Sequence, residues 1–258
     1  MDFGTGCLVC GDEIIYSEVV TTFTCFYCGV TKETNASCRM GHYVCDACHN
    51  GSANDLIERY CSTTDSALPL SIALKLMKNP VVKMHGPEHH FLVPAVLLAA
   101  YCHADRSMKR DVTEKIREAR KRAEDVKGGF CGFQGACGAA VGAGIFMSLI
   151  TGATPLSDRE RQLSNRITAE CLRAIAENGG ARCCKRESLC TIITAAGFVQ
   201  REFGVVLPVE LPSQCSFSHQ NRECIRGRCR FFGADRVVEQ QGSILGSPEF
   251  ILIRGDIP

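Results

Sequence analysis

The sequence predicts a mostly α-helical protein with a small N-terminal zinc-binding module of short strands and turns. From about residue 52 onward, apolar residues recur with the period of a helix, and no long alternating strand pattern follows residue 60. Seven of the 18 cysteines lie within the first 50 residues, where apolar runs are short. We therefore expect a zinc-binding module over residues 1–50 and a helical main domain over residues 51–235.

The helices of the main domain are predicted from their periodicity and their end signals. The clearest covers residues 157–178, in which Leu163, Ile167 and Cys171 recur every four residues. Its first residues include Ser157 and Glu160, which have the spacing of a capping box. Further helices are predicted over residues 53–60, 70–77, 94–103, 111–127 and 189–203.

An uncharged stretch over residues 135–154 is long enough to span a bilayer. It consists largely of glycine and alanine, contains the polar residues Ser148 and Thr151, and lacks the aromatic residues that flank membrane spans. We therefore predict a tightly packed, buried helix at this position and no membrane partner.

The cysteines are expected to be reduced thiols in the cytoplasm. Residues 1–6 have neither the basic nor the apolar segment of a secretory signal, and a chain of 258 residues does not need disulfides to stabilise its core. The net charge of +1 excludes a global electrostatic field for nucleic acid. Residues 246–250, GSPEF, resemble a cloning scar, so we treat residues 236–258 as a tail and name a vector origin as one reading of it.

The N-terminal segment contains four pairs of potential metal ligands. Two residues between thiolates allow one tight turn to direct both sulfurs at the same ion, and two such turns complete a tetrahedral site. The pairs are Cys7 and Cys10, Cys25 and Cys28, Cys38 and His42, and Cys45 and Cys48. Eight ligands predict two structural zinc ions, whose ligand pairs combine either in sequence order or in alternation. Bound metal would supply the stability that so small a core lacks; a redox-active or iron-loaded site and unliganded cysteines are the alternatives.

Residues 84–90, MHGPEHH, place several proton-transferring groups at the start of a predicted helix. A helix N-terminus favours anions and lowers the pKa of a nearby histidine, which would then serve as a neutral base. The candidate catalytic residues are His85, Glu88, His89 and His90. Helix capping and metal ligation remain open as alternative roles.

A second group of cysteines lies in the main domain without the paired C-x2-C spacing of structural zinc. Cysteines on separate loops are typical of iron–sulfur ligands, and a cluster held by three thiolates keeps one iron open as a Lewis acid. The candidate cluster ligands are Cys131, Cys137, Cys183, Cys184 and Cys190. Another metal or free thiols are the alternatives, and buried free thiols are predicted at Cys61, Cys102 and Cys171. The sequence leaves open whether Cys215, Cys224 and Cys229 bind metal.

Five motifs carry a resemblance to a known family: CLVCG, NASCRMGHYVCDACH, MHGPEHHFLVPAVLLAAY, CGFQGACGAAVGAGIF and CCKRESLCTIITAA. Together they resemble a cysteine-rich domain of unknown function from anaerobic bacteria and archaea, sometimes attached to methyltransferase-like domains, and the resemblance covers about residues 7–230. The second cysteine group is also similar to the iron–sulfur lyases serine dehydratase and cysteine desulfidase. That similarity implies a [4Fe–4S] cluster on Cys137, Cys183 and Cys190.

These observations predict an iron–sulfur-dependent enzyme that acts on a small polar or sulfur-containing substrate, either as a lyase or desulfidase or by sulfur transfer. Lys185 and Arg186 would bind a substrate carboxylate unless they belong to a solvated helix start. The alternative is a non-catalytic zinc protein that binds RNA, such as tRNA, or a protein partner. It would use the basic stretches at residues 109–127 and 222–230, because phosphate binding requires little more than clustered positive charge.

Overall fold

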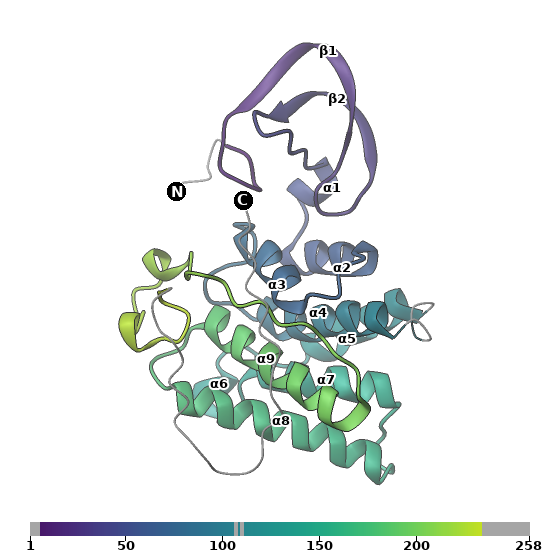
Figure 1. Ribbon diagram of the computed structural model, residues 1–258, viewed down its shortest axis with the longest axis vertical. Coiled ribbons are helices and arrows are strands. Elements are labelled where there is room, and N and C mark those ends of the chain that lie inside the picture. The colour runs from purple at the N-terminus through teal and green to yellow at the C-terminus, as the bar shows by residue number, and fades with distance from the viewer. Residues whose placement is uncertain (1–5, 106–107, 109–110, 234–258) are drawn as a thin grey trace.

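The computed structural model describes residues 6–105, 108 and 111–233, and within them the protein is mostly helical with a small N-terminal hairpin. The predicted fold class is thereby confirmed. Figure 1 shows the hairpin at one end of the molecule, next to a body of packed helices. The predicted tail over residues 236–258 lies outside the described residues. The strands are β1 (Ile14–Thr24) and β2 (Thr31–Cys38), and the helices are α1 (Asp46–His49), α2 (Ala53–Thr63), α3 (Pro69–Lys78), α4 (Glu88–Ala104), α5 (Val112–Glu124), α6 (Phe130–Phe133), α7 (Gly138–Thr151), α8 (Arg159–Asn178) and α9 (Cys184–Phe203).

The N-terminal hairpin buries very little apolar surface. Its strands pair antiparallel, from Ile14 opposite Cys38 to Thr24 opposite Thr31. The side chains of β1 are largely exposed, including Tyr16 at 75% and Val19 at 68%. A two-stranded ribbon of this kind is marginal in water, so its stability must come from contacts at its base, where the metal ligands lie.

Helix α4 forms the centre of the helical body. From Phe91 to Cys102 every residue of this helix is buried, as expected for a helix that is apolar on all sides. It contacts α2, α3, α5, α7 and α9. The helix predicted over residues 94–103 therefore extends further toward the N-terminus, and it contains Pro94.

The glycine- and alanine-rich stretch forms α7, which packs closely on α4 and α8. Close approach is possible because Gly142 has no side chain: a Cβ there would lie 2.8 Å from the His90 carbonyl oxygen. The prediction of a buried packing helix is confirmed. Among the described residues, no helix has the length and apolar character needed to cross a membrane.

The start of α8 differs from the prediction. The helix begins at Arg159, and its N-cap residue Asp158 makes no side-chain cap. The Ser157 hydroxyl instead accepts a hydrogen bond from the Thr154 N–H at 3.0 Å, in the manner of a local serine turn. The predicted capping box is therefore wrong, because the Ser157 side chain serves the preceding loop.

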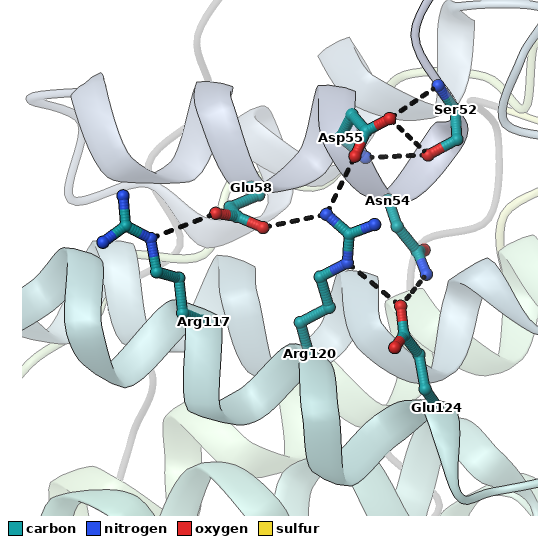
Figure 2. Close-up of polar contacts among 7 residues, drawn as sticks. All are labelled: Ser52, Asn54, Asp55, Glu58, Arg117, Arg120 and Glu124. Carbon is teal, nitrogen blue, oxygen red and sulfur yellow. Dashed lines mark hydrogen bonds and ion pairs between the residues drawn. The ribbon is translucent and has the colours of Figure 1, made fainter.

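A capping box is present at α2 instead, and it belongs to a polar network between α2 and α5 (Figure 2). The Arg120 guanidinium donates to Asp55 and Glu58, at 2.9 Å each, and to Glu124 at 3.0 Å. Arg117 reaches Glu58 at 3.3 Å. Much of the positive charge predicted to bind RNA is thus balanced by neighbouring carboxylates; residues 109 and 110 of that stretch lie outside the described residues.

Candidate metal centres

The base of the hairpin brings four ligands from two distant pairs together. The ligand atoms of Cys7, Cys10, Cys38 and His42 all lie within 4.8 Å of one another. The Sγ atoms of Cys10 and Cys38 are 3.8 Å apart, and the Cys38 Sγ lies 3.3 Å from the His42 Nδ1. Cys38 is the last residue of β2 and pairs with Ile14 at the start of β1. This register places the pair Cys38 and His42 next to the pair Cys7 and Cys10.

The second group consists of Cys25, Cys28, Cys45 and Cys48, whose ligand atoms also lie within 4.8 Å of one another. The Sγ atoms of Cys28 and Cys45 are 3.6 Å apart. Burial raises the pKa of Cys25, but backbone N–H groups, that of Cys45 first, outweigh it and bring the pKa to about 7. At Cys25 the surroundings therefore favour the thiolate, the form that binds metal, whereas burial raises the pKa of Cys28 and of Cys48.

Both groups have the dimensions of a tetrahedral thiolate site. A Zn–S bond of about 2.3 Å places sulfurs about 3.8 Å apart around one ion, whereas a disulfide would bring them to about 2.05 Å. All 18 cysteines are free thiols. Two groups can thus each hold a metal ion, and the ligand pairs combine in alternation, the first with the third and the second with the fourth.

The metal-binding module packs directly on the helical body. The Arg59 Nη1 on α2 lies 4.0 Å from the Cys48 Sγ, and the rings of Tyr27 and Tyr60 meet edge to face at 6.3 Å. Cys25, Tyr27 and Cys48 join the same buried core as the helices. One continuous core thus includes residues on both sides of residue 50. The predicted domain boundary at residue 50 therefore stays a prediction.

The histidine-rich turn brings the Glu88 Oε1 to 3.9 Å from the His89 Nδ1, while the hydrogen-bond contacts of its four predicted catalytic residues go to different neighbours. The His85 Nε2 lies 3.3 Å from the Asn221 Oδ1, and its Nδ1 is buried without a partner. Glu88 instead accepts a hydrogen bond from the Lys83 N–H at 2.9 Å. His85 thus faces the C-terminal segment, and Glu88 holds its own turn.

The other two histidines point into the helical body. The His90 Nδ1 lies 2.8 Å from the Val126 carbonyl oxygen, and its ring packs so closely on Gly138 that a Cβ there would lie 2.1 Å from it. His89 is buried, with its Nδ1 at 3.2 Å from the Gly86 carbonyl oxygen and its Nε2 without a partner. The proton-transfer roles of all four residues remain predictions, and His85 is the one that lies beside the cysteines of the C-terminal segment.

His89 makes stability depend on pH. Burial first, and then the charge of Lys185, lowers the pKa of its imidazole from 6.5 to about 3. Because the folded pKa is below the unfolded one, the stability contribution is complete above pH 6.5 and is lost as the pH falls toward 3. We expect the free energy of unfolding to be about 2 kcal/mol lower at pH 5 than at pH 7 through this residue.

Urea unfolding of the helical signal at both pH values measures this effect. The His89→Gln variant should lose about 2 kcal/mol of the pH difference seen in the wild type, whereas His219→Gln, at an exposed position, should retain it. Acid release of bound metal affects all three proteins alike, so the comparison between variants isolates His89. An unchanged pH difference in His89→Gln would contradict the assignment.

The start of α9 buries a run of charged and thiol side chains. Cys183, Lys185, Arg186 and Glu187 are all buried. The Cys137 thiol donates to one carboxylate oxygen of Glu187 at 3.4 Å, and the Cys183 N–H donates to the other at 3.2 Å. The structure thus brings two predicted cluster ligands, Cys137 and Cys183, to one carboxylate.

Lys185 and Arg186 are not part of a solvated helix start, because their exposed fractions are 2% and 5%. The Lys185 ammonium donates to the carbonyl oxygens of Met77 and Val82, at 2.8 and 3.1 Å, and lies 4.5 Å from the centre of the Phe217 ring. Burial lowers its pKa to about 8. Arg186 donates to the Ala181 carbonyl oxygen at 2.8 Å, while its Nε is buried without a partner.

The remaining predicted cluster ligands lie on two other sides of α9. Cys184 faces the histidine-rich turn. Burial raises the pKa of its thiol to about 11, and the charge of Cys131 contributes to this shift. The Gly86 N–H of the turn acts in the opposite direction, but burial outweighs it. Cys190 is buried in the core, where burial raises its pKa to about 12. The five predicted cysteines therefore surround the first turns of α9 without converging on one point.

The C-terminal segment adds three cysteines that the sequence left unassigned. After Gly204 ends α9, the chain runs back along that helix to its start (Figure 1). There Cys215, Cys224 and Cys229 line one small cavity of about 30 Å³ together with Cys183. The sequence signal was present, since three cysteines fall within a short segment that has no helical period, but their partner Cys183 is distant in the chain.

The fold and the two ligand groups define a helical protein with a cross-braced metal-binding module at its N-terminus. The chain belongs to a family of unknown function, DUF5714, whose model matches residues 57–232. The match begins after the metal-binding module and includes the histidine-rich turn, the start of α9 and the C-terminal cysteines. No curated protein and no solved structure matches the chain.

Proposed function

We propose that the protein is an iron–sulfur-dependent enzyme that acts on a small polar or sulfur-containing substrate, by elimination or by sulfur transfer. Its N-terminal module would hold two structural zinc ions, since closed four-ligand sites of this kind are normally structural. The observation that carries the proposal is the buried run Cys183–Glu187, where thiols and charged groups meet. Reduced thiols throughout the chain fit the reducing cytoplasm.

The charges at the start of α9 favour a bound anionic group. Lys185 and Arg186 are both buried, and the Glu187 carboxylate lies 3.8 Å from the Arg186 Nη2. Burial lowers the pKa of Lys185, and the Glu88 carboxylate, whose side chain is 10% exposed, opposes this effect. Buried charges are costly unless they are paired, and such arrangements concentrate at functional sites. A thiolate-bound iron–sulfur cluster is negatively charged and would add to the carboxylates that already act on these two cations. The positive end of the α9 dipole acts in the same direction.

The surrounding residues suggest how the substrate would be handled. The cluster would supply either a Lewis-acidic iron or sulfur chemistry when bound. His85, whose Nδ1 has no partner, would accept or donate a proton beside the C-terminal cysteines. Cys184 and Cys131, whose charge contributes to the raised pKa of Cys184, would serve as sulfur-handling thiols. Lys185 already donates to two carbonyl groups, so it is less suited to bind a substrate carboxylate.

A second candidate function is a non-catalytic zinc protein that binds a protein partner or RNA. The exposed apolar side chains of the hairpin, among them Tyr16, Val19 and Val20, favour a protein partner. RNA binding has less support, because Arg117 and Arg120 are engaged by carboxylates on α2 (Figure 2). This candidate function requires bound zinc but no iron or sulfide, so the metal content of the protein distinguishes it from the proposed enzyme.

Metal and sulfide analysis of protein purified without oxygen tests the proposal. We expect about two zinc, four iron and four sulfide per chain, with the visible absorption of thiolate-bound iron. The loaded protein should then eliminate water from small hydroxyl-bearing substrates or release sulfide from small thiol-bearing ones. Exposure to air should abolish this activity. Zinc alone, with no colour after reconstitution with iron and sulfide, would contradict the enzyme and favour the binding protein.

A further inference from the structure

The cavity at the start of α9 is lined by four thiols. Cys183 comes from the N-cap of α9, and Cys215, Cys224 and Cys229 come from the segment that folds back over it. Burial raises the pKa of Cys183 and of Cys215; the charge of Cys215 contributes to the first shift, and the charges of Cys229 and Cys224 contribute to the second. Neither Cys137 nor Cys190 is among the described residues that line this cavity.

The turns that carry these cysteines resemble those of the N-terminal metal ligands. The Arg226 N–H donates to the Cys224 Sγ, two residues before it, at 3.4 Å. The Val9 N–H makes the same contact, also at 3.4 Å, with the candidate metal ligand Cys7. Such N–H groups stabilise thiolates. Arg226 has a φ of 46°, in the left-handed region that side chains other than glycine rarely adopt, so this turn is held at a cost that a ligand-binding role explains.

The cavity also receives polar groups that lack partners. The Arg186 Nε is buried without an acceptor, and the Arg186 side chain lines the cavity at 5% exposure. The Nδ2 of Asn221, another lining residue, is likewise buried without an acceptor. Buried donors without an acceptor destabilise the folded state. Both are donors, so the missing partner is an electron-rich group, as the sulfides and thiolates of a cluster are.

The four thiols of the cavity do not have the close spacing of a single tetrahedral ion. Both N-terminal groups have all four ligand atoms within 4.8 Å, as a single tetrahedral ion requires. Within residues 6–105, 108 and 111–233, no third set of three ligand atoms meets this limit. In a [4Fe–4S] cluster each thiolate binds a different iron, so the sulfurs lie further apart. The covering segment contains, among the described residues, only the single-turn 3₁₀ helices Ser218–Gln220 and Arg226–Arg228, and the cavity of about 30 Å³ would have to widen to admit a cluster.

We infer that Cys183, Cys215, Cys224 and Cys229 are the four ligands of a [4Fe–4S] cluster. The assignment rests on the proposed iron–sulfur function and replaces Cys137 and Cys190 as ligands. The Cys137 thiol is engaged by Glu187 at 3.4 Å, and Cys190 is enclosed by the helical core at 1% exposure. Four thiolates leave no iron open for direct coordination of a substrate. A cluster with this ligand set would therefore not act on the substrate as a Lewis acid.

The test compares single substitutions in the full chain, purified without oxygen and reconstituted with iron and sulfide. We expect Cys215→Ser and Cys229→Ser to lose most of the roughly four iron and four sulfide and their visible absorption. Cys137→Ser and Cys190→Ala, the matched controls, should retain them. Zinc content of about two per chain and an unchanged far-ultraviolet circular dichroism spectrum show in each case that the protein has folded.

Three other results would overturn the assignment. If Cys137→Ser and Cys190→Ala lose the iron while Cys215→Ser and Cys229→Ser keep it, the ligand set is wrong but the iron–sulfur function stands. If the wild type carries about three zinc and Cys215→Ser loses one of them, the cavity holds zinc. If the wild type takes up no iron at all, both the ligand set and the proposed function fail.

Discussion

Replacing Cys45 with alanine is expected to release one of the two bound metal ions and to unfold the N-terminal module. Cys45 lies 3.6 Å from Cys28 at the centre of its ligand group. The hairpin beyond it has almost no core of its own, as the exposure of β1 shows. Metal binding contributes about 10–16 kcal/mol to small zinc modules, so three ligands in place of four remove most of the stability of this segment.

The effect is measured by zinc content and by limited proteolysis. Cleavage should move into residues 11–45 in Cys45→Ala, while the helices retain their circular dichroism signal. The control is Cys61→Ala, which removes an equally buried thiol from α2 outside both ligand groups. It should keep about two zinc per chain and a protected hairpin. If the hairpin of Cys45→Ala stays resistant to proteolysis, its contacts with α2 are enough to keep it folded, and the prediction is wrong.

Replacing Phe146 with alanine is expected to lower the free energy of unfolding of the helical body by about 3–5 kcal/mol. Phe146 is fully buried on α7, and its ring meets that of Tyr101 on α4 edge to face, with centroids 5.8 Å apart. The substitution leaves a cavity between two helices whose close approach, at Gly142, gives little room for collapse. Urea denaturation of the metal-loaded protein measures the change.

The control for this prediction is the same substitution on the surface. Phe133 is 88% exposed at the end of α6, so Phe133→Ala should change the free energy of unfolding by no more than about 0.5 kcal/mol. Equal effects at the two positions would contradict the packing of α7 on α4. Retention of about two zinc in Phe146→Ala would further show that the module binds metal independently of a fully stable helical body.

The sequence alone identified the candidate metal ligands of the N-terminal module but not their pairing. A C-x2-C turn is local, so its spacing identifies Cys7 with Cys10 or Cys25 with Cys28 as ligands of one ion. Whether the first pair meets the second or the third depends on the hairpin. The β1–β2 register places Cys38 opposite Ile14 and produces the alternating arrangement, and strand register is a non-local property.

The sequence predicted those features of the helices that depend on neighbouring residues in the chain. The glycine- and alanine-rich helix and the helical main domain were predicted correctly from composition and periodicity. The capping box at Ser157 failed because that hydroxyl bonds to Thr154 in the preceding loop. The real one, at Ser52 and Asp55, was missed. A side chain that can cap a helix can equally serve a turn, and only the surrounding structure decides between the two.

The second cysteine group shows most clearly what only the tertiary structure decided. Composition and spacing singled out Cys183 and its neighbours as chemically unusual residues. They did not reveal that Lys185 and Arg186 are buried, or that Cys215 and Cys229 return to the same cavity. Sequence patterns report periodicity and turns over a few residues, whereas this cavity is built by a segment that reverses direction after α9. Contacts between residues so far apart in the chain arise from packing of the whole core, and no local signal encodes them.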